Sequence, residues 1–149
     1  MSFTGNMPAT LFWECLLRIF LAALCGLVIG FERKARLKEA GVRTHLIVAL
    51  GAALITIVSK YGFFDLALFA EGIKADPTRI AAQIVSGVGF LGAGMIFMRH
   101  RTLTGLTTAA GIWTTAGIGM AVGCGLYAVS LFSTALVVLT QLMLHRDYR

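Results

Sequence analysis

The clearest place where side chains of this sequence could do chemistry is the motif Asp76-Pro77-Thr78-Arg79, which Gln83 follows one helical turn later. The motif stands directly before a long apolar stretch. A carboxylate there can meet a hydrated cation, because Mg²⁺ often binds through one or two carboxylates and keeps several of its waters. Asp76 can instead cap a helix that begins at Pro77. The residue types leave both roles open, with Asp76 as the one candidate metal ligand.

Further charged residues lie within or beside the apolar stretches. Arg18 follows Glu14 by four residues, so the two share one helix face and are expected to form a buried pair. The alternative is an arginine that extends to the outer membrane surface. Glu32, Arg43 and His45 are the other functional candidates. His45 can titrate near neutral pH, or it can be an ordinary polar residue at the membrane interface.

No set of residues in this sequence predicts catalysis. It contains neither a His-Glu-x-x-His zinc motif nor a phosphate-binding loop. Residues 87–92 match G-x-G-x-x-G, but a dinucleotide site needs a preceding strand and a water-exposed helix start, and this match lies inside an apolar stretch. The three cysteines are scattered and predict neither a disulfide framework nor a zinc site. We therefore expect a protein that is not an enzyme and holds no cofactor.

Membrane helices are the elements expected to position these residues. The chain has 149 residues, of which 58% are hydrophobic and 13% charged, and its mean hydropathy is +0.84. A soluble fold of this size could not bury so much apolar surface, so lipid is the expected solvent. The net charge of +6 lies in short gaps between apolar stretches. Membrane topology and anionic headgroups explain that pattern, and a nucleic-acid partner is not expected.

Five apolar stretches of roughly twenty residues predict an all-α domain with five transmembrane helices. Their approximate ranges are 11–31, 44–64, 79–98, 103–122 and 126–144. Basic residues gather after the first and third stretches and in the C-terminal tail, which predicts an outside N-terminus and a cytoplasmic C-terminus. A short interfacial helix is expected near the start of the outer loop, 65–78. Trp113, at the middle of the fourth stretch, is expected to be buried against other helices.

Glycines are concentrated in the third and fourth stretches and predict close helix packing. In the third stretch they leave one side of the helix nearly bare, and in the fourth two of them form a G-x-x-x-G motif. These residues are Gly87, Gly89, Gly92 and Gly94, and Gly119 and Gly123. The bare side of the third stretch can contact a second copy of the chain or a helix of another membrane protein.

Three segments occur together in a way that is specific. They are GFERK at 30–34 with GVRTHL at 41–46, DPTRIAAQIVSGVGFLGAG at 76–94, and GLTTAAGIW at 105–113. Together they resemble the MgtC/SapB family of bacterial inner-membrane proteins, over about residues 10–145. The resemblance implies five membrane helices and a role in magnesium homeostasis, adaptation to low magnesium and virulence. It also implies action through other membrane proteins, the ATP synthase among them.

The resemblance places the acidic residue of the family at Asp76, followed by Arg79 and Gln83, and its Arg-Thr-His motif at 43–45. Many members carry a soluble domain after the fifth helix, whereas this chain ends at Arg149, so a single transmembrane domain, 1–149, is expected. The expected partners are the bilayer, further copies of the chain or other membrane proteins. The alternative is a small transporter or channel subunit for Mg²⁺ or another ion, with a polar path from Asp76 through Gln83 to Thr107 and Thr108.

Overall fold

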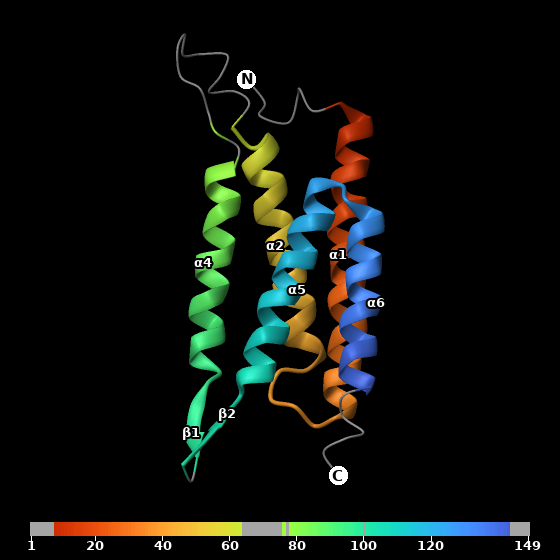
Figure 1. The fold of residues 1–149 in the computed structure, drawn as a ribbon. Helices are drawn as coiled ribbons and strands as arrows, with labels where there is room; N and C mark the ends of the chain where they lie inside the picture. The colour runs from red at the N-terminus through yellow and green to blue at the C-terminus, as the bar shows by residue number, and fades with distance from the viewer. Residues whose placement is uncertain (1–7, 64–75, 77, 100, 144–149) are drawn as a thin grey trace.

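A computed structural model describes residues 8–63, 76, 78–99 and 101–143, which form five helices and one short β-hairpin (Figure 1). The helices are α1 (Ala9–Ala35), α2 (Val42–Tyr61), α4 (Thr78–Gly94), α5 (Leu106–Cys124) and α6 (Tyr127–Met143). The strands are β1 (Phe97–Arg99) and β2 (Thr102–Thr104). Apart from the hairpin, the helical class predicted from the apolar stretches is confirmed for these residues.

The hairpin corrects the predicted ends of the third and fourth helical stretches. β1 and β2 pair antiparallel, with Phe97 opposite Thr104. Gly105 ends the hairpin at φ +85°, and a Cβ at this position would collide with the carbonyl oxygen of Met95, so glycine is required. The prediction of a helix continuing to Met98 is wrong because a short apolar run fits a strand as well as a helix.

The α2 helix lies at the centre of the bundle and packs closely between α1 and α5. A Cβ added at Gly26 of α1 would collide with the carbonyl oxygen of His45 and come within 2.9 Å of the Ala49 Cβ. On α5, a Cβ at Gly119 would collide with the carbonyl oxygen of Ala49. Ala49 is fully buried between these two glycines. Close backbone contact thus takes the place of large side chains in this part of the core.

The α4 helix lies at the edge of the bundle, against α2 and α5 (Figure 1). Its buried residues, Ile84, Val88 and Gly92, are four apart and form one narrow stripe. Of its glycines, Gly92 contacts a neighbour, since its Cβ would lie 3.6 Å from the Cβ of Ala109. A Cβ at each of the others would meet nothing within 4 Å; these are Gly87, Gly89 and Gly94.

Large apolar side chains cover the outside of the bundle, as expected where lipid replaces water. Phe90 on α4 is 81% exposed. Trp113 is 53% exposed, so the prediction that it is buried between helices is wrong. The buried face of α5 carries small residues such as Gly119, which bring the helices too close for an indole ring to fit between them.

Two helices, α1 and α2, are long and apolar enough to cross a membrane. The α4 and α6 helices have 17 residues each, and α5 is rich in glycine and threonine. These properties agree with a membrane protein, while the five crossings remain a prediction. The interfacial helix predicted at the start of the outer loop falls on residues 64–75, outside the described part of the chain.

Candidate functional site

The predicted functional residues lie at two opposite ends of the bundle (Figure 1). At one end, where α4 begins, are Asp76, Arg79 and Gln83. At the other end, where α1 finishes and α2 begins, are Glu32, Arg43 and His45. The structure therefore separates the six residues into two sites.

Asp76 caps the start of α4. Its Oδ1 accepts hydrogen bonds from the hydroxyl of Thr78 at 2.6 Å and from the backbone N–H of Thr78 at 2.9 Å. The hydroxyl bond, followed by the backbone bond, holds the pKa of Asp76 below its ordinary value. The side chain is exposed, so a charged carboxylate faces water at neutral pH. Among the described residues, no group of three or more His, Cys, Asp or Glu could hold a metal ion.

Gln83 lines a groove of about 360 Å³ between α2 and α4. Apart from Gln83, the lining is apolar or glycine. Gly51 of α2 and Gly87 of α4 both line the groove. Neither glycine has a neighbour within 4 Å of an added Cβ. Arg79 is exposed at the start of α4. The apolar groove runs along the middle of α2 and α4, from Gln83 toward Leu91.

Arg18 joins α1 to three other helices close to this end. The side chain is buried and forms an ion pair with Glu14, which is itself 44% exposed. One Nη1–H bond goes to the carbonyl oxygen of Gly123 at 2.8 Å, and further N–H groups lie 3.3 Å from the hydroxyls of Tyr61 and Tyr127. The pair proposed from the spacing is therefore one part of a larger set. The signal for the rest was the guanidinium itself, whose five donors one glutamate cannot satisfy.

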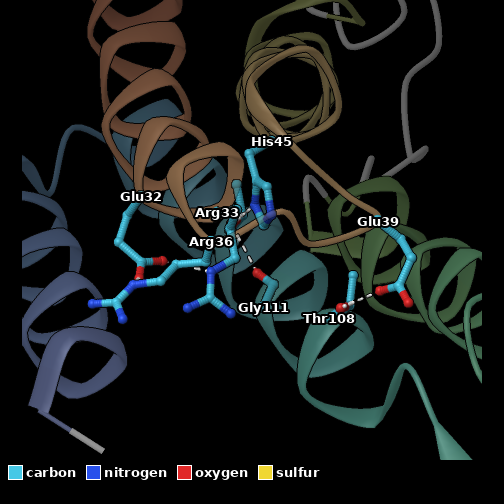
Figure 2. Close-up of polar contacts among 8 residues, drawn as sticks. Glu32, Arg33, Arg36, Glu39, His45, Thr108 and Gly111 are labelled. Atoms are coloured by element: carbon cyan, nitrogen blue, oxygen red, sulfur yellow. Dashed lines mark hydrogen bonds and ion pairs between the residues drawn. The ribbon is translucent and has the colours of Figure 1, made fainter. Parts of the chain in front are cut away.

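Glu32 holds two arginines at the opposite end of the bundle (Figure 2). Its Oε2 accepts from Nε of Arg33 at 2.6 Å, and its Oε1 accepts from Nε of Arg36 at 3.2 Å. Glu32 and Arg33 are both buried, so each neutralises the charge of the other. Arg43 is exposed at the start of α2. The spacing of four between Glu32 and Arg36 was a readable signal for the second bond.

His45 points from α2 to α5 inside the bundle (Figure 2). It is 0% exposed, so the interpretation as a polar residue at the membrane interface is wrong. Gly26 lets α1 approach the backbone carbonyl of this residue closely. The ring Nδ1 lies 2.8 Å from the Oγ1 of Thr115, whose hydroxyl lies 2.8 Å from the carbonyl oxygen of Gly111.

A second contact ties the connection between α1 and α2 to α5. The hydroxyl of Thr108 donates to Oε2 of Glu39 at 3.1 Å (Figure 2). Glu39 was not among the predicted site residues, and nothing in its surroundings in the sequence marks it. This contact and the bond between His45 and Thr115 both link the region where α1 connects to α2 with α5.

Replacing Glu32 by glutamine is expected to lower the free energy of unfolding by about 1.5–3 kcal/mol, because buried Arg33 loses its counter-charge. The measurement is thermal unfolding of the purified protein in detergent. Glu39→Gln is the matched control, since Glu39 is exposed and accepts from a neutral hydroxyl. Equal losses in the two variants would contradict the role given to the Glu32 ion pairs.

Comparison with known proteins places the chain among related sequences. The family model described as the MgtC family matches residues 19–148. The chain is 47% identical over 133 residues to the protein named "Putative magnesium transporter YhiD" of Escherichia coli strain K12, which covers 89% of the chain and 61% of that protein. It is 42% identical over 123 residues to the protein MgtC of Brucella abortus, covering 83% and 48%.

The protein SapB of Bacillus subtilis is 40% identical over 98 residues, which are 65% of this chain and 42% of that protein. This chain thus spans about three fifths or less of the length of these relatives. No solved structure matches. The family model covers nearly the whole chain, and the protein belongs to the MgtC family.

Proposed function

We propose that this protein is a non-enzymatic inner-membrane protein that serves magnesium homeostasis and stress survival by binding other membrane proteins. Family membership supports the link to magnesium, as does the name of the relative from Escherichia coli. The proposed topology has five crossings, with the N-terminus outside and the C-terminus in the cytoplasm. The magnesium-linked role rests on relatives, while the mode of action rests on the surface of the bundle.

The groove between α2 and α4 is the observation that carries the proposed mode of action. Gly51 and Gly87 line it and have open space where a Cβ would lie. Packing among the described residues therefore does not require glycine at either position. In a membrane, glycines on an open face let a further helix approach to backbone contact, which is a common basis of helix association there.

The alternative is a subunit of a small transporter or channel. The ionised, exposed carboxylate of Asp76 favours it, because such a group can attract a hydrated Mg²⁺. Two features favour the binding role instead. The groove below Asp76 has Gln83 as its one polar lining residue, and Thr108 lies at the other end of the bundle, where it bonds to Glu39. A polar path through the described residues would therefore have to pass an apolar groove.

Crosslinking is expected to identify the groove as a contact surface. A cysteine at position 87, in a chain whose native cysteines are replaced by alanine, should form crosslinked species in native membranes. The control is a cysteine at Gly117 of α5, which also has nothing within 4 Å of an added Cβ but lies outside the groove. A product of twice the chain mass would indicate a homo-oligomer, and any other mass a foreign partner. Equal crosslinking at both positions, or none at position 87, would contradict the proposal.

Purified protein in liposomes separates the proposal from the alternative. With a trapped Mg²⁺ dye, wild type and Asp76→Ala should both show the same signal as protein-free liposomes. Insertion is checked by protease accessibility, so that silence cannot come from misfolded protein. Influx in the wild type that Asp76→Ala removes would make this protein a transporter or channel.

A further inference from the structure

In the proposed topology, Gln83 places a side-chain amide inside the membrane, at the groove between α2 and α4. The α4 helix has 17 residues and is about 25 Å long, so its whole length is needed to cross a hydrocarbon core of about 30 Å. Gln83 lies about 7 Å from the start of α4 at Thr78. In the described part of the chain, its amide forms no hydrogen bond. An unbonded amide is costly in lipid, so a ligand with a polar group at that depth is expected.

The groove itself has the shape of a channel for one hydrocarbon chain. From Gln83 to Leu91 it extends about 12 Å along α4, so its volume of about 360 Å³ corresponds to a cross-section of about 30 Å². An extended hydrocarbon chain fits such a section, whereas a helix, about 10 Å across, would lie over the groove. Gly51 and Gly87 keep the groove open, because a larger side chain at either position would extend into it.

The start of α4, just before the groove, carries charges of both signs. Arg79 precedes Gln83 by four residues, so the two lie on one face of the helix, and Arg79 is exposed. Asp76 is exposed as well, and Thr78 donates two hydrogen bonds to its carboxylate. Neither charge belongs to an ion pair among the described residues. A guanidinium is a strong partner for phosphate, and a carboxylate for an ammonium group.

We infer that a zwitterionic phospholipid with an ammonium headgroup, such as phosphatidylethanolamine, binds in this groove. Arg79 binds its phosphate and Asp76 attracts its ammonium group. The NH₂ of Gln83 donates to an ester carbonyl oxygen, and one acyl chain lies in the groove as far as Leu91. The groups along α4 are charged, then polar, then apolar, which is the order of groups along a phospholipid.

The lipid goes beyond the proposed function, because the isolated chain binds it without a partner protein. A partner helix that packs on Gly51 and Gly87 has to displace the acyl chain, since both glycines line the same groove. The amount of this lipid in the membrane therefore regulates association at the groove.

Native mass spectrometry of the purified protein in detergent, titrated with phosphatidylethanolamine, tests the inference. Wild type should hold one lipid. Arg79→Gln should weaken binding about fivefold or more, because a charged hydrogen bond to the phosphate is lost. Gly87→Leu should abolish binding, since leucine fills the groove while its Cβ meets nothing within 4 Å. Equal binding by wild type and these two variants would overturn the inference.

Two matched controls should bind the lipid as wild type does. Arg43→Gln removes an exposed arginine at the start of α2, at the other end of the bundle. Gly117→Leu adds the same side chain to open space outside the groove. An equal loss of lipid in the controls would overturn the placement at the groove. A dimer that holds no lipid would mean that a second copy fills the groove and would also overturn the inference.

The headgroup and the position of the acyl chain have tests of their own. Phosphatidylglycerol has a net negative charge and no ammonium group, so it should bind wild type several-fold more weakly, and Asp76→Asn should remove this difference. At one lipid per protein, a photoreactive acyl chain should label α2 and α4. Equal binding of the two lipids by wild type would overturn the headgroup, and labelling mainly of α6 the groove. Because no partner is present, lipid binding can hold where crosslinking from position 87 in membranes fails, so the two results stay separate.

Discussion

Gly26→Leu is expected to prevent accumulation of folded protein. A Cβ at this position already collides with the carbonyl oxygen of His45, and leucine adds three more carbons between α1 and α2. Overpacking of a side-chain core costs about 1–3 kcal/mol where neighbours can shift, but here the obstacle is helix backbone, which cannot turn aside. The measurement is the monodisperse fraction of a fluorescent fusion after detergent extraction, which should fall to background.

The smaller substitution Gly26→Ala tests the same close contact between α1 and α2 with a single added methyl group. It should unfold at a clearly lower temperature than wild type, because the added methyl meets the carbonyl oxygen of His45 and lies 2.9 Å from the Ala49 Cβ, so that α1 and α2 must move apart. Gly119→Ala should behave alike, since it meets Ala49 from α5. Gly117→Ala is the control with open space around it. If all three alanine variants were as stable as wild type, the close crossing of α1, α2 and α5 would be wrong.

Arg18→Leu is expected to insert normally and to lower the free energy of unfolding by about 1–3 kcal/mol. Leucine suits the bilayer, so insertion is not at risk. The loss comes from the buried partners left behind. Among the described residues, Arg18 is the side chain that donates to the carbonyl oxygen of Gly123, at 2.8 Å from Nη1, and two tyrosine hydroxyls also lose a contact. Chemical unfolding in mixed micelles, followed by circular dichroism, measures the change.

Two variants frame that result. Lys60→Leu removes a positive charge at the same end, where the amine makes a long bond of 3.4 Å to the carbonyl oxygen of Cys124, and should cost less than about 1 kcal/mol. Glu14→Leu should cost at least as much as Arg18→Leu, because it leaves the guanidinium of Arg18, which is 6% exposed, without its counter-charge. An increase in stability in both Arg18→Leu and Glu14→Leu would contradict a stabilising role for the pair.

We expect the two ends of the bundle to differ in role, with the open surface along α4 serving association and the buried polar groups near Glu32 serving stability. On the side of α4 the surface is open, with a charged carboxylate at its start and an apolar groove along its middle. Near Glu32 and His45 the polar groups are buried and bonded to one another or across to α5. Substitutions in the groove should therefore change association while leaving the fold intact, and substitutions around Glu32 should do the reverse.

The helices could be predicted from the sequence because a long apolar stretch in lipid can satisfy all its backbone hydrogen bonds by forming a helix. The capping position of Asp76 was readable for a similar reason, since an Asp-Pro pair before an apolar stretch is a local signal. The hairpin at 97–104 was not, because it depends on the contact between Gly105 and the Met95 carbonyl. Local patterns thus determined the elements, and contacts corrected their ends.

Glycine shows most clearly what only the tertiary structure decides. Gly87 and Gly119 look alike in the sequence, yet Gly119 meets the backbone of α2 and Gly87 faces open space. Glycine permits another helix to approach closely, but the sequence does not show which helix that is. The arrangement of the helices decides it. The same holds for His45, whose burial against Thr115 depends on α5, seventy residues later. By itself, the sequence determined the helices, the family and the residues available for chemistry; the packing decided which of them are bonded inside and which remain open to a partner.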